Sequence, residues 1–115
     1  MLKKLRTIVY HTPDITAGKA WYIQATGSQP YFDEPFYVGF DINGYELGLT
    51  PDTPGIPGGN QATTFWAVDD VQAEAERLIQ IGAEMVQEKT DVGGNIFTGI
   101  VKDPFGNHIG LIQGA

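Results

Sequence analysis

Three side chains in this chain of 115 residues combine a reactive type with a suggestive position. His11 closes a run rich in β-branched residues, and Glu46 and His108 each follow a tight turn and precede apolar residues. Imidazole nitrogens and carboxylate oxygens bind divalent metals and act as general acids and bases. Polar residues are equally expected at the rims of strands, so the spacing makes these residues candidates and leaves both interpretations open.

A pair of carboxylates, Asp69 and Asp70, is a fourth candidate for acid–base or metal chemistry. The clearest helical period in the chain begins directly after it, at Val71, Ala75, Leu78 and Ile79. Aspartate at a helix N-terminus caps free N–H groups and complements the helix dipole. The position therefore favours helix capping over catalysis.

Other catalytic signatures are weak or missing from the sequence. With no cysteine, the chain has no disulfide, thiolate ligand or cysteine nucleophile. The glycine-rich residues 57–60 lack the lysine and helix start of a phosphate-binding loop. Neither a Ser-His-Asp arrangement nor a dinucleotide fingerprint is present.

Length and charge narrow the class of protein further. A chain of 115 residues with a net charge of −7 is expected to form one domain that binds neither nucleic acid nor anionic membranes. No apolar run reaches the ~20 residues of a membrane span. Residues 1–6 are basic but no apolar stretch follows them, so we expect no signal peptide and a cytoplasmic location.

The first half of the chain reads as strand, helix, strand, strand, strand. The pattern predicts a strand over residues 5–11 and a helix from Asp14 or Thr16 to Gly27. Three further strands are expected around residues 30–32, 36–42 and 45–50, and Asn43-Gly44 is a strong hairpin signal between the last two.

The second half repeats this order after a Pro/Gly-rich linker. We predict a strand over residues 63–68, the helix that follows Asp70, and strands over residues 84–88, 96–101 and 109–112. Superposing the halves places Thr7 on Thr63 and Gly48 on Gly110. The predicted fold is α+β, with two βαβββ modules whose mixed four-stranded sheets curve around a shared cleft. Module one is about 1–50, the linker about 51–61 and module two about 62–115.

A turn near the C-terminus, residues 103–106 (Asp-Pro-Phe-Gly), is the most specific motif. Pro104 fixes its own φ and disfavours helix at Asp103, and Gly106 tolerates positive φ. The turn therefore predicts a closing hairpin.

The chain resembles the glyoxalase/bleomycin-resistance/extradiol dioxygenase family, the vicinal oxygen chelate superfamily. The resemblance rests on the paired modules, on Trp21-Tyr22 in the first helix, on residues 68–71 and on residues 102–109. It implies one metal ligand on the first and last strand of each module, usually histidine or glutamate. The corresponding residues here are Thr7, Gly48, Thr63 and Gly110, so the resemblance implies the fold without the usual metal site.

A displaced metal site is the alternative. Because strand side chains alternate between faces, His11 shares a face with Thr7, Glu46 with Gly48, and His108 with Gly110. A metal held by Glu46, His108 and His11 would support a lyase or dioxygenase of the same superfamily.

The same alternation predicts the residues that face the cleft. Nine candidates for ligand binding follow: Thr7, Val9, His11, Glu46, Gly48, Thr63, Phe65, His108 and Gly110. They are mostly small or apolar, which suits an apolar or aromatic ligand, and the negative net charge favours a cationic one. The aromatic residues Phe36, Tyr37 and Phe40 could add a wall, or neighbouring side chains could fill the space.

The leading functional hypothesis is a metal-free module that binds or sequesters a small molecule without a cofactor. Half-exposed sheet faces require a partner, so we expect a homodimer. A structural or regulatory dimer with no small-molecule ligand is a third interpretation.

Overall fold

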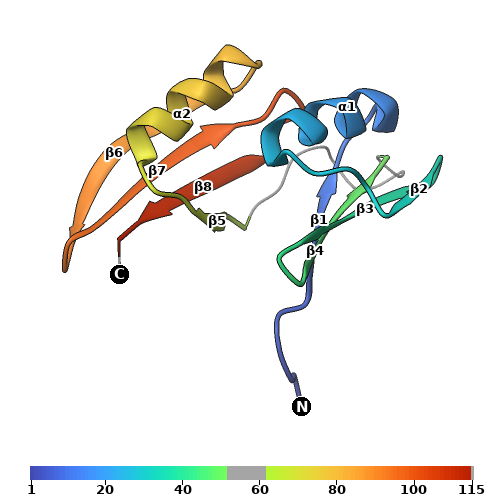
Figure 1. Cartoon of the computed structure of the whole chain (residues 1–115), viewed down its shortest axis with the longest axis horizontal. Helices are drawn as coiled ribbons and strands as arrows, with labels where there is room; N and C mark the ends of the chain where they lie inside the picture. The colour runs from blue at the N-terminus through green and yellow to red at the C-terminus, as the bar shows by residue number, and fades with distance from the viewer. Residues whose placement is uncertain (52–61, 115) are drawn as a thin grey trace. The chain divides into compact units, whose positions relative to one another are not determined.

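The computed structural model describes residues 1–51 and 62–114 (Figure 1). The predicted linker lies outside the described residues except for Pro51. The chain divides into two compact units, Met1–Gly58 and Gly59–Ala115. Each unit has the order strand, helix, strand, strand, strand.

Unit one contains β1 (Thr7–His11), α1 (Ile15–Thr26), β2 (Phe32–Glu34), β3 (Tyr37–Ile42) and β4 (Tyr45–Thr50). Its sheet has the order β1-β4-β3-β2. The first strand pairs in parallel with β4, and the other neighbours are antiparallel. The helix after β1 provides the crossover that this parallel pairing requires.

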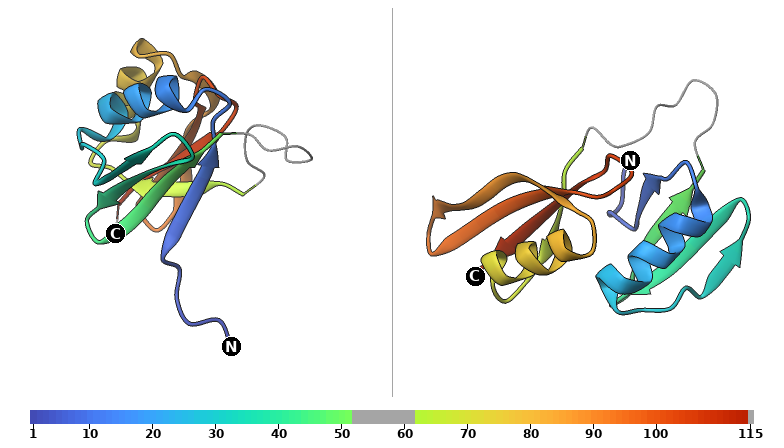
Figure 2. Two further views of the ribbon diagram at one scale, coloured as in Figure 1. Left: turned by 90° about the vertical axis from the view of Figure 1, so that its right-hand side faces the viewer. Right: turned by 90° about the horizontal axis from the view of Figure 1, so that it is seen from above.

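Unit two contains β5 (Thr64–Ala67), α2 (Val71–Gln80), β6 (Glu84–Gly93), β7 (Ile96–Lys102) and β8 (His108–Gln113), in the sheet order β5-β8-β7-β6. Within each unit the helix lies along one face of its own sheet (Figure 2). These two mixed sheets confirm the predicted α+β fold of two βαβββ modules. The shared cleft stays a prediction. In the part of the chain that the structure describes, neither helix is long and apolar enough to cross a membrane.

The core of each unit lies between its helix and its sheet. In unit one, Trp21 and Tyr22 of α1 pack edge to face with ring centroids 4.8 Å apart, and Tyr22 lies 5.7 Å from Tyr10 of β1. In unit two, α2 buries an apolar face against the sheet. Its buried members are Val71, Ala75 and Leu78, and those of the sheet are Val101, Ile109 and Leu111. The helical period of the sequence predicted the apolar face of α2, and Ile109 and Leu111 share one face of β8 because they stand two residues apart.

Both helices begin at an aspartate that caps them. Oδ1 of Asp14 accepts a hydrogen bond from the Ala17 N–H at 3.1 Å, and Oδ1 of Asp70 accepts one from the Ala73 N–H at 3.1 Å. The capping interpretation of Asp70 is therefore confirmed. Gly27, at φ 73°, ends α1 in the left-handed conformation that glycine adopts without strain.

Some predicted strand boundaries are wrong. The strand predicted over residues 84–88 extends as β6 to Gly93, because three shifts in register let it keep pairing along β7. The first strand begins at Thr7 and not at residue 5, and the fifth begins at Thr64, which leaves Thr63 just before it.

The closing hairpin is held by a buried carboxylate. Asp103 is 2% exposed, and its Oδ1 accepts hydrogen bonds from the N–H groups of Phe105 at 2.9 Å and Asn107 at 2.7 Å. Its Oδ2 accepts a third from the Asn107 side-chain amide at 2.9 Å. Gly106 has φ 94°, as the motif predicted. The sequence pointed to Pro104 and Gly106 and missed the role of Asp103.

Candidate functional site

Two glycines on adjacent strands of unit one support two tyrosine rings. Gly39 of β3 and Gly48 of β4 are cross-strand partners on the face turned away from α1, which we call the helix-free face. A Cβ added at Gly48 would lie 2.6 Å from Tyr37 Cζ, and one at Gly39 would lie 3.2 Å from Tyr31 Cε1. Real Cβ atoms do not approach a ring as closely as 2.6 Å, so Gly48 is what allows the Tyr37 ring to lie against the sheet. At Gly39 a Cβ would be a tight contact, which the Tyr31 ring would relieve by shifting a few tenths of an ångström.

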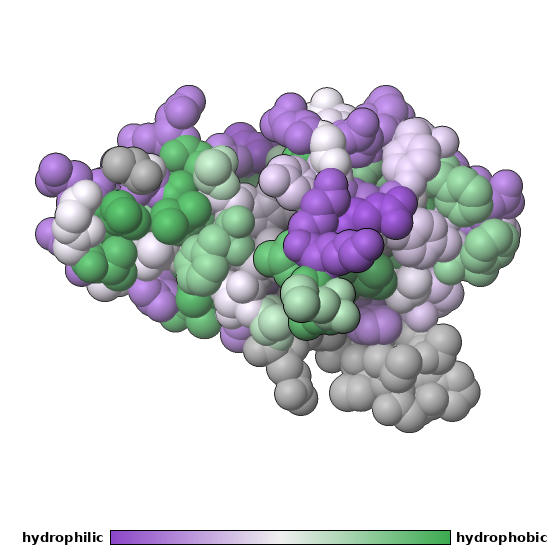
Figure 3. Space-filling view, turned by 90° about the horizontal axis from the view of Figure 1, so that it is seen from below, coloured by the Kyte–Doolittle hydropathy of each residue, from purple (hydrophilic) through white to green (hydrophobic). Residues whose placement is uncertain are grey.

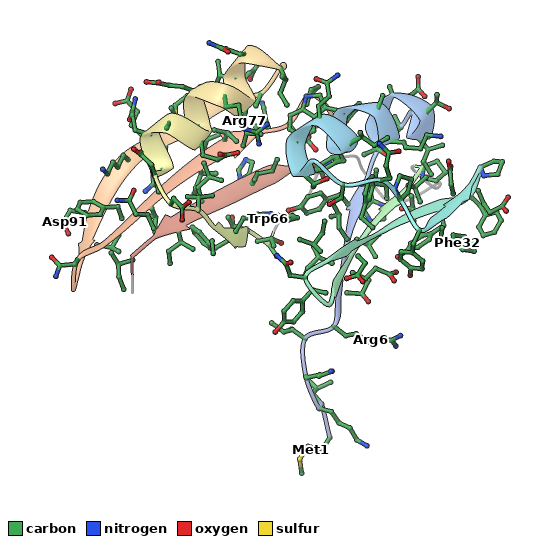
Figure 4. All side chains as sticks on the ribbon, in the orientation of Figure 1. Met1, Arg6, Phe32, Trp66, Arg77 and Asp91 are labelled. Atoms are coloured by element: carbon green, nitrogen blue, oxygen red, sulfur yellow. The ribbon has the colours of Figure 1, made fainter. Side chains whose placement is uncertain are left out.

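The two phenol groups converge on one carboxylate. The Tyr31 hydroxyl donates to Oε1 of Glu46, and the Tyr37 hydroxyl donates to Oε2. We call these three residues the tyrosine–glutamate cluster. Phe32 extends the aromatic surface, with its ring centroid 6.1 Å from that of Tyr37 (Figure 4 labels Phe32). Tyr31 is 63% exposed, so one side of its ring is accessible.

The hydrogen bonds set the charge of the cluster. Donation by Tyr31 and then by Tyr37 holds the pKa of Glu46 below its usual range, although burial opposes this effect. The charge of Arg6 is the smallest of these causes and also lowers the pKa. Burial and then the bond to Glu46 raise the pKa of Tyr37, and the bond to Glu46 is the largest cause of the raised pKa of Tyr31. At neutral pH the cluster therefore carries one carboxylate charge and two protonated phenols.

The parallel pairing of β1 with β4 places the other candidates of unit one. Thr7 is the register partner of Glu46, and Val9 is the partner of Gly48. His11 lies further along β1, where its Nδ1 is 3.1 Å from Oγ1 of Thr50. The structure thus brings Thr7, Val9 and Gly48 next to the cluster and places His11 at the other end of the strand.

Unit two has an aromatic ring over the matching glycine, but from another strand. Phe65 of β5 is the register partner of Gly110 of β8, and a Cβ at Gly110 would lie 2.6 Å from Phe65 Cδ1. Hydrophobic side chains gather on this helix-free face (Figure 3). Its apolar members around the glycine are Phe65, Ala67, Ile100 and Ile112.

The rim of this second face carries an ion pair beside a histidine. His108 pairs across the strands with Lys102, whose Nζ lies 3.5 Å from Oε2 of Glu84. Thr63 is half-buried just before β5. Of the candidates in unit two, the structure brings Phe65 and Gly110 into contact and places His108 two residues from Gly110 on the same face.

The residues at the family's ligand positions do not fit its metal. Gly48 and Gly110 offer no donor, and the rings of Tyr37 and Phe65 occupy the space beside them. A threonine hydroxyl, as at Thr7, is a poor ligand for a divalent ion compared with histidine or a carboxylate. Across residues 1–51 and 62–114, no three or more His, Cys, Asp or Glu side chains lie together in a way that could hold an ion.

Sequence reasoning missed the role of the two tyrosine hydroxyls. Of the three residues of the expected aromatic wall, Phe40 points to the core and is fully buried. Tyr37 and Phe36 each lie 6.1 Å from the Phe32 ring, so these two belong to one aromatic surface. The sequence did contain a signal for the position of the Tyr37 ring. Tyr37 stands two residues before Gly39, so both face the same side of β3, and the hairpin at Asn43-Gly44 brings Gly48 opposite.

Comparison with known proteins shows the family. A family model described as Glyoxalase/Bleomycin resistance protein/Dioxygenase superfamily matches residues 4–111, so the chain belongs to this superfamily. A relative in Mycobacterium tuberculosis (strain CDC 1551 / Oshkosh), named "Putative glyoxylase CFP32", is 30% identical over 111 residues. The alignment covers 89% of this chain and 42% of that protein, so the chain spans less than half of its relative's length.

Solved structures share the fold. A glyoxalase-related enzyme from Fulvimarina pelagi aligns with a TM-score of 0.82 and 19% identity, over 98% of this chain and 89% of that one. A glyoxalase/bleomycin resistance protein/dioxygenase family enzyme from Burkholderia phytofirmans PsJN aligns with a TM-score of 0.79 and 20% identity, over 96% and 98% of the two chains.

Proposed function

We propose that this protein binds or sequesters a small molecule without a metal cofactor. One observation carries the proposal: where the resemblance places a metal-binding side chain on the last strand of each module, the chain has a glycine covered by an aromatic ring. Tyr37 covers Gly48, and Phe65 covers Gly110. Aromatic rings offer stacking and dispersion surfaces, which suit an apolar or aromatic ligand.

The proposed ligand-contacting residues lie on the helix-free faces of both units. They are the nine sequence candidates, Thr7, Val9, His11, Glu46, Gly48, Thr63, Phe65, His108 and Gly110, together with Tyr31 and Tyr37. Phe65 is 46% exposed, and Val9 is also exposed. Apolar surface of this kind favours burial against a ligand or a second copy.

A homodimer in the cytoplasm is the proposed working form. Exposed apolar side chains on both sheets support association, as in the symmetric assemblies that most oligomers form. Light scattering after size exclusion tests the assembly, and a monomer at micromolar concentration would contradict it.

Metal analysis combined with thermal unfolding tests the proposal. We expect the purified protein to hold far less than one divalent ion per chain, and its melting temperature to be unchanged by EDTA. A library of aromatic compounds, screened in EDTA, should contain a ligand that stabilises the chain. A ligand present at 100 times its Kd stabilises by about 2.7 kcal/mol.

The competing metal-dependent lyase or dioxygenase predicts the opposite. A stoichiometric ion that is lost in both Glu46→Ala and His108→Ala would establish the displaced site and overturn the proposal. Asp91→Ala, a change in an exposed carboxylate at the far end of β6, serves as the matched control.

A further inference from the structure

We propose that the tyrosine–glutamate cluster of unit one recognises a planar organic cation. The cation would stack on the exposed tyrosine surface and pair with the Glu46 charge. The inference rests on the proposed function and names the class of ligand that one of the two faces selects.

The two glycines beneath the tyrosine rings give the site its shape. Gly39 and Gly48 let the Tyr31 and Tyr37 rings lie against the sheet, and their hydroxyls are fixed on one carboxylate. Phe32 lies 6.1 Å from both Tyr37 and Phe36, so the aromatic surface continues onto the edge strand. Rings held in this way lose little freedom when a flat ligand stacks on them, which reduces the cost of binding.

The charge gives the site its preference. An aromatic face carries negative electrostatic potential and attracts cations within about 6 Å. Glu46 is ionised at neutral pH, and the two donating phenols hold its pKa below the usual range. Two donors leave part of its acceptor capacity unused. Asp41, the cross-strand partner of Glu46, adds a second carboxylate to the same face.

Arg6 is a positive charge that acts on the cluster and opposes a bound cation. Its charge lowers the pKa of Glu46, and its backbone oxygen accepts from the Glu46 N–H at 3.2 Å. Arg6 is exposed, so solvent screens its charge. The exposed rings and the two carboxylates together favour a cation over a neutral or anionic compound of the same shape.

Unit two provides an internal control. Its helix-free face also carries a ring on a glycine, Phe65 on Gly110. Its rim holds Lys102 and His108 in place of Asp41 and Glu46, and the one carboxylate beside them, Glu84, is paired with Lys102. A planar cation should therefore bind to unit one and leave unit two unperturbed.

Three probes of one shape test the inference. 1-Methylquinolinium is a planar cation, 1-methylnaphthalene is its neutral isostere, and 1-naphthoate is an anion of similar size. Titration of isotope-labelled protein, followed by amide NMR, should show the cation shifting Tyr37, Gly39 and Gly48. We expect the cation to bind about tenfold more tightly than the neutral compound, and the anion most weakly.

Two variants assign the selectivity to the cluster. Glu46→Gln removes the charge and keeps one oxygen acceptor, so one tyrosine still donates to residue 46 and the other must accept from the new NH₂ group. The affinity for 1-methylquinolinium should fall about tenfold, while that for 1-methylnaphthalene changes by less than about twofold. Tyr31→Leu removes an exposed ring and should weaken the binding of both ligands about threefold. Because this side chain is exposed, the substitution should leave the protein folded, so weaker binding would not be a result of unfolding. Glu84→Gln in unit two should change neither affinity.

Equal affinity for the cation and its neutral isostere would overturn the inference, as would unchanged cation binding in Glu46→Gln. No amide shift in unit one at millimolar 1-methylquinolinium would do the same. None of these results bears on the metal content, which decides the proposed function separately. If a neutral aromatic compound stabilises the metal-free protein and the cation does not, the proposed function stands and the choice of ligand class is wrong.

Discussion

The two units cover equivalent glycines from opposite sides. In unit one the ring over Gly48 comes from β3, and its hydroxyl is tied to Glu46. In unit two the ring over Gly110 comes from β5, the strand on the other side of β8, and Phe65 has no hydroxyl. In both units an aromatic ring therefore fills the space above the glycine, and the strand that supplies the ring differs.

The rims of the two faces differ in charge. The cross-strand pair Asp41 and Glu46 of unit one occupies the place of Lys102 and His108 in unit two. Backbone pairing is the same at both rims, so pairing alone does not set the sign. The two modules thus share their backbone pairing and differ in the charged side chains at the rim of each face.

The largest expected difference in stability between the units comes from the hairpin that joins the last two strands of each unit. Asp103→Ala removes a buried acceptor of three hydrogen bonds and should lower the free energy of unfolding of unit two by about 3 kcal/mol. Asp41→Ala removes one bond, to the Gly44 N–H, at an exposed turn and should cost about 0.5 kcal/mol. Equal costs would show that burial does not distinguish the two turns.

Each unit has one tryptophan, so fluorescence can follow them separately. Trp21 lies in α1 and Trp66 in β5 (Figure 4 labels Trp66). Urea unfolding of Trp66→Phe reports on unit one and that of Trp21→Phe on unit two. Each unit-one variant is therefore measured in the Trp66→Phe protein, and each unit-two variant in the Trp21→Phe protein.

A methyl group at each glycine tests how firmly the rings are held. Gly48→Ala should destabilise unit one by about 2 kcal/mol, because the Tyr37 ring must move and lose its bond to Glu46. Gly110→Ala should cost about 1 kcal/mol, since the half-exposed Phe65 can swing away. If Gly110→Ala costs more, Phe65 is held by contacts that its exposure does not reveal.

Removal of the Tyr37 hydroxyl tests how much its hydrogen bond to Glu46 contributes to stability. Tyr37→Phe keeps the ring over Gly48 but deletes the donor to Glu46, and should destabilise unit one by about 1 kcal/mol. The exposed Tyr45→Phe is the control and should be nearly neutral. A neutral Tyr37→Phe would mean that ring packing alone holds the cluster.

The smallest expected effect is a dependence on pH. The folded-state pKa of Glu46 is lowered, so its ionisation adds stability above its usual pKa and loses that stability as pH falls through the lowered value. Tyr31, Tyr37, Arg6 and Asp41 are the groups around it. Glu46→Gln should flatten the acid limb of the stability curve of unit one by less than about 1 kcal/mol and leave unit two unchanged. Identical acid limbs would contradict this assignment.

Much of the fold follows from short-range rules that the sequence displays. The twofold period of strands predicted which of Tyr10, Leu47 and Leu111 point inward, and the aspartates at both helix starts predicted the caps. The glycine positions also came from the sequence, since the repeat places Gly48 and Gly110 at equivalent points.

The contents of the site depended on contacts that no local pattern encodes. A β3 residue covers the glycine of unit one and a β5 residue covers that of unit two, and each choice depends on rotamers that tertiary packing selects. The convergence of two tyrosines on Glu46 could therefore not be predicted. The length of β6 depended on register shifts against β7, and the burial of Asp103 depended on the loop that closes over it.

The ring over Gly48 constrains how this site can change by mutation. Gly48→Glu alone would push its Cβ into the Tyr37 ring, and Tyr37→Ala alone would strip a donor from Glu46 and expose Gly48. Because the two residues are in contact, their effects are not additive, and a carboxylate at position 48 becomes tolerable only after the ring is gone. The aromatic form and a carboxylate-bearing form of this site are thus separated by less stable single-step intermediates, so exchange between them requires two coupled substitutions in unit one.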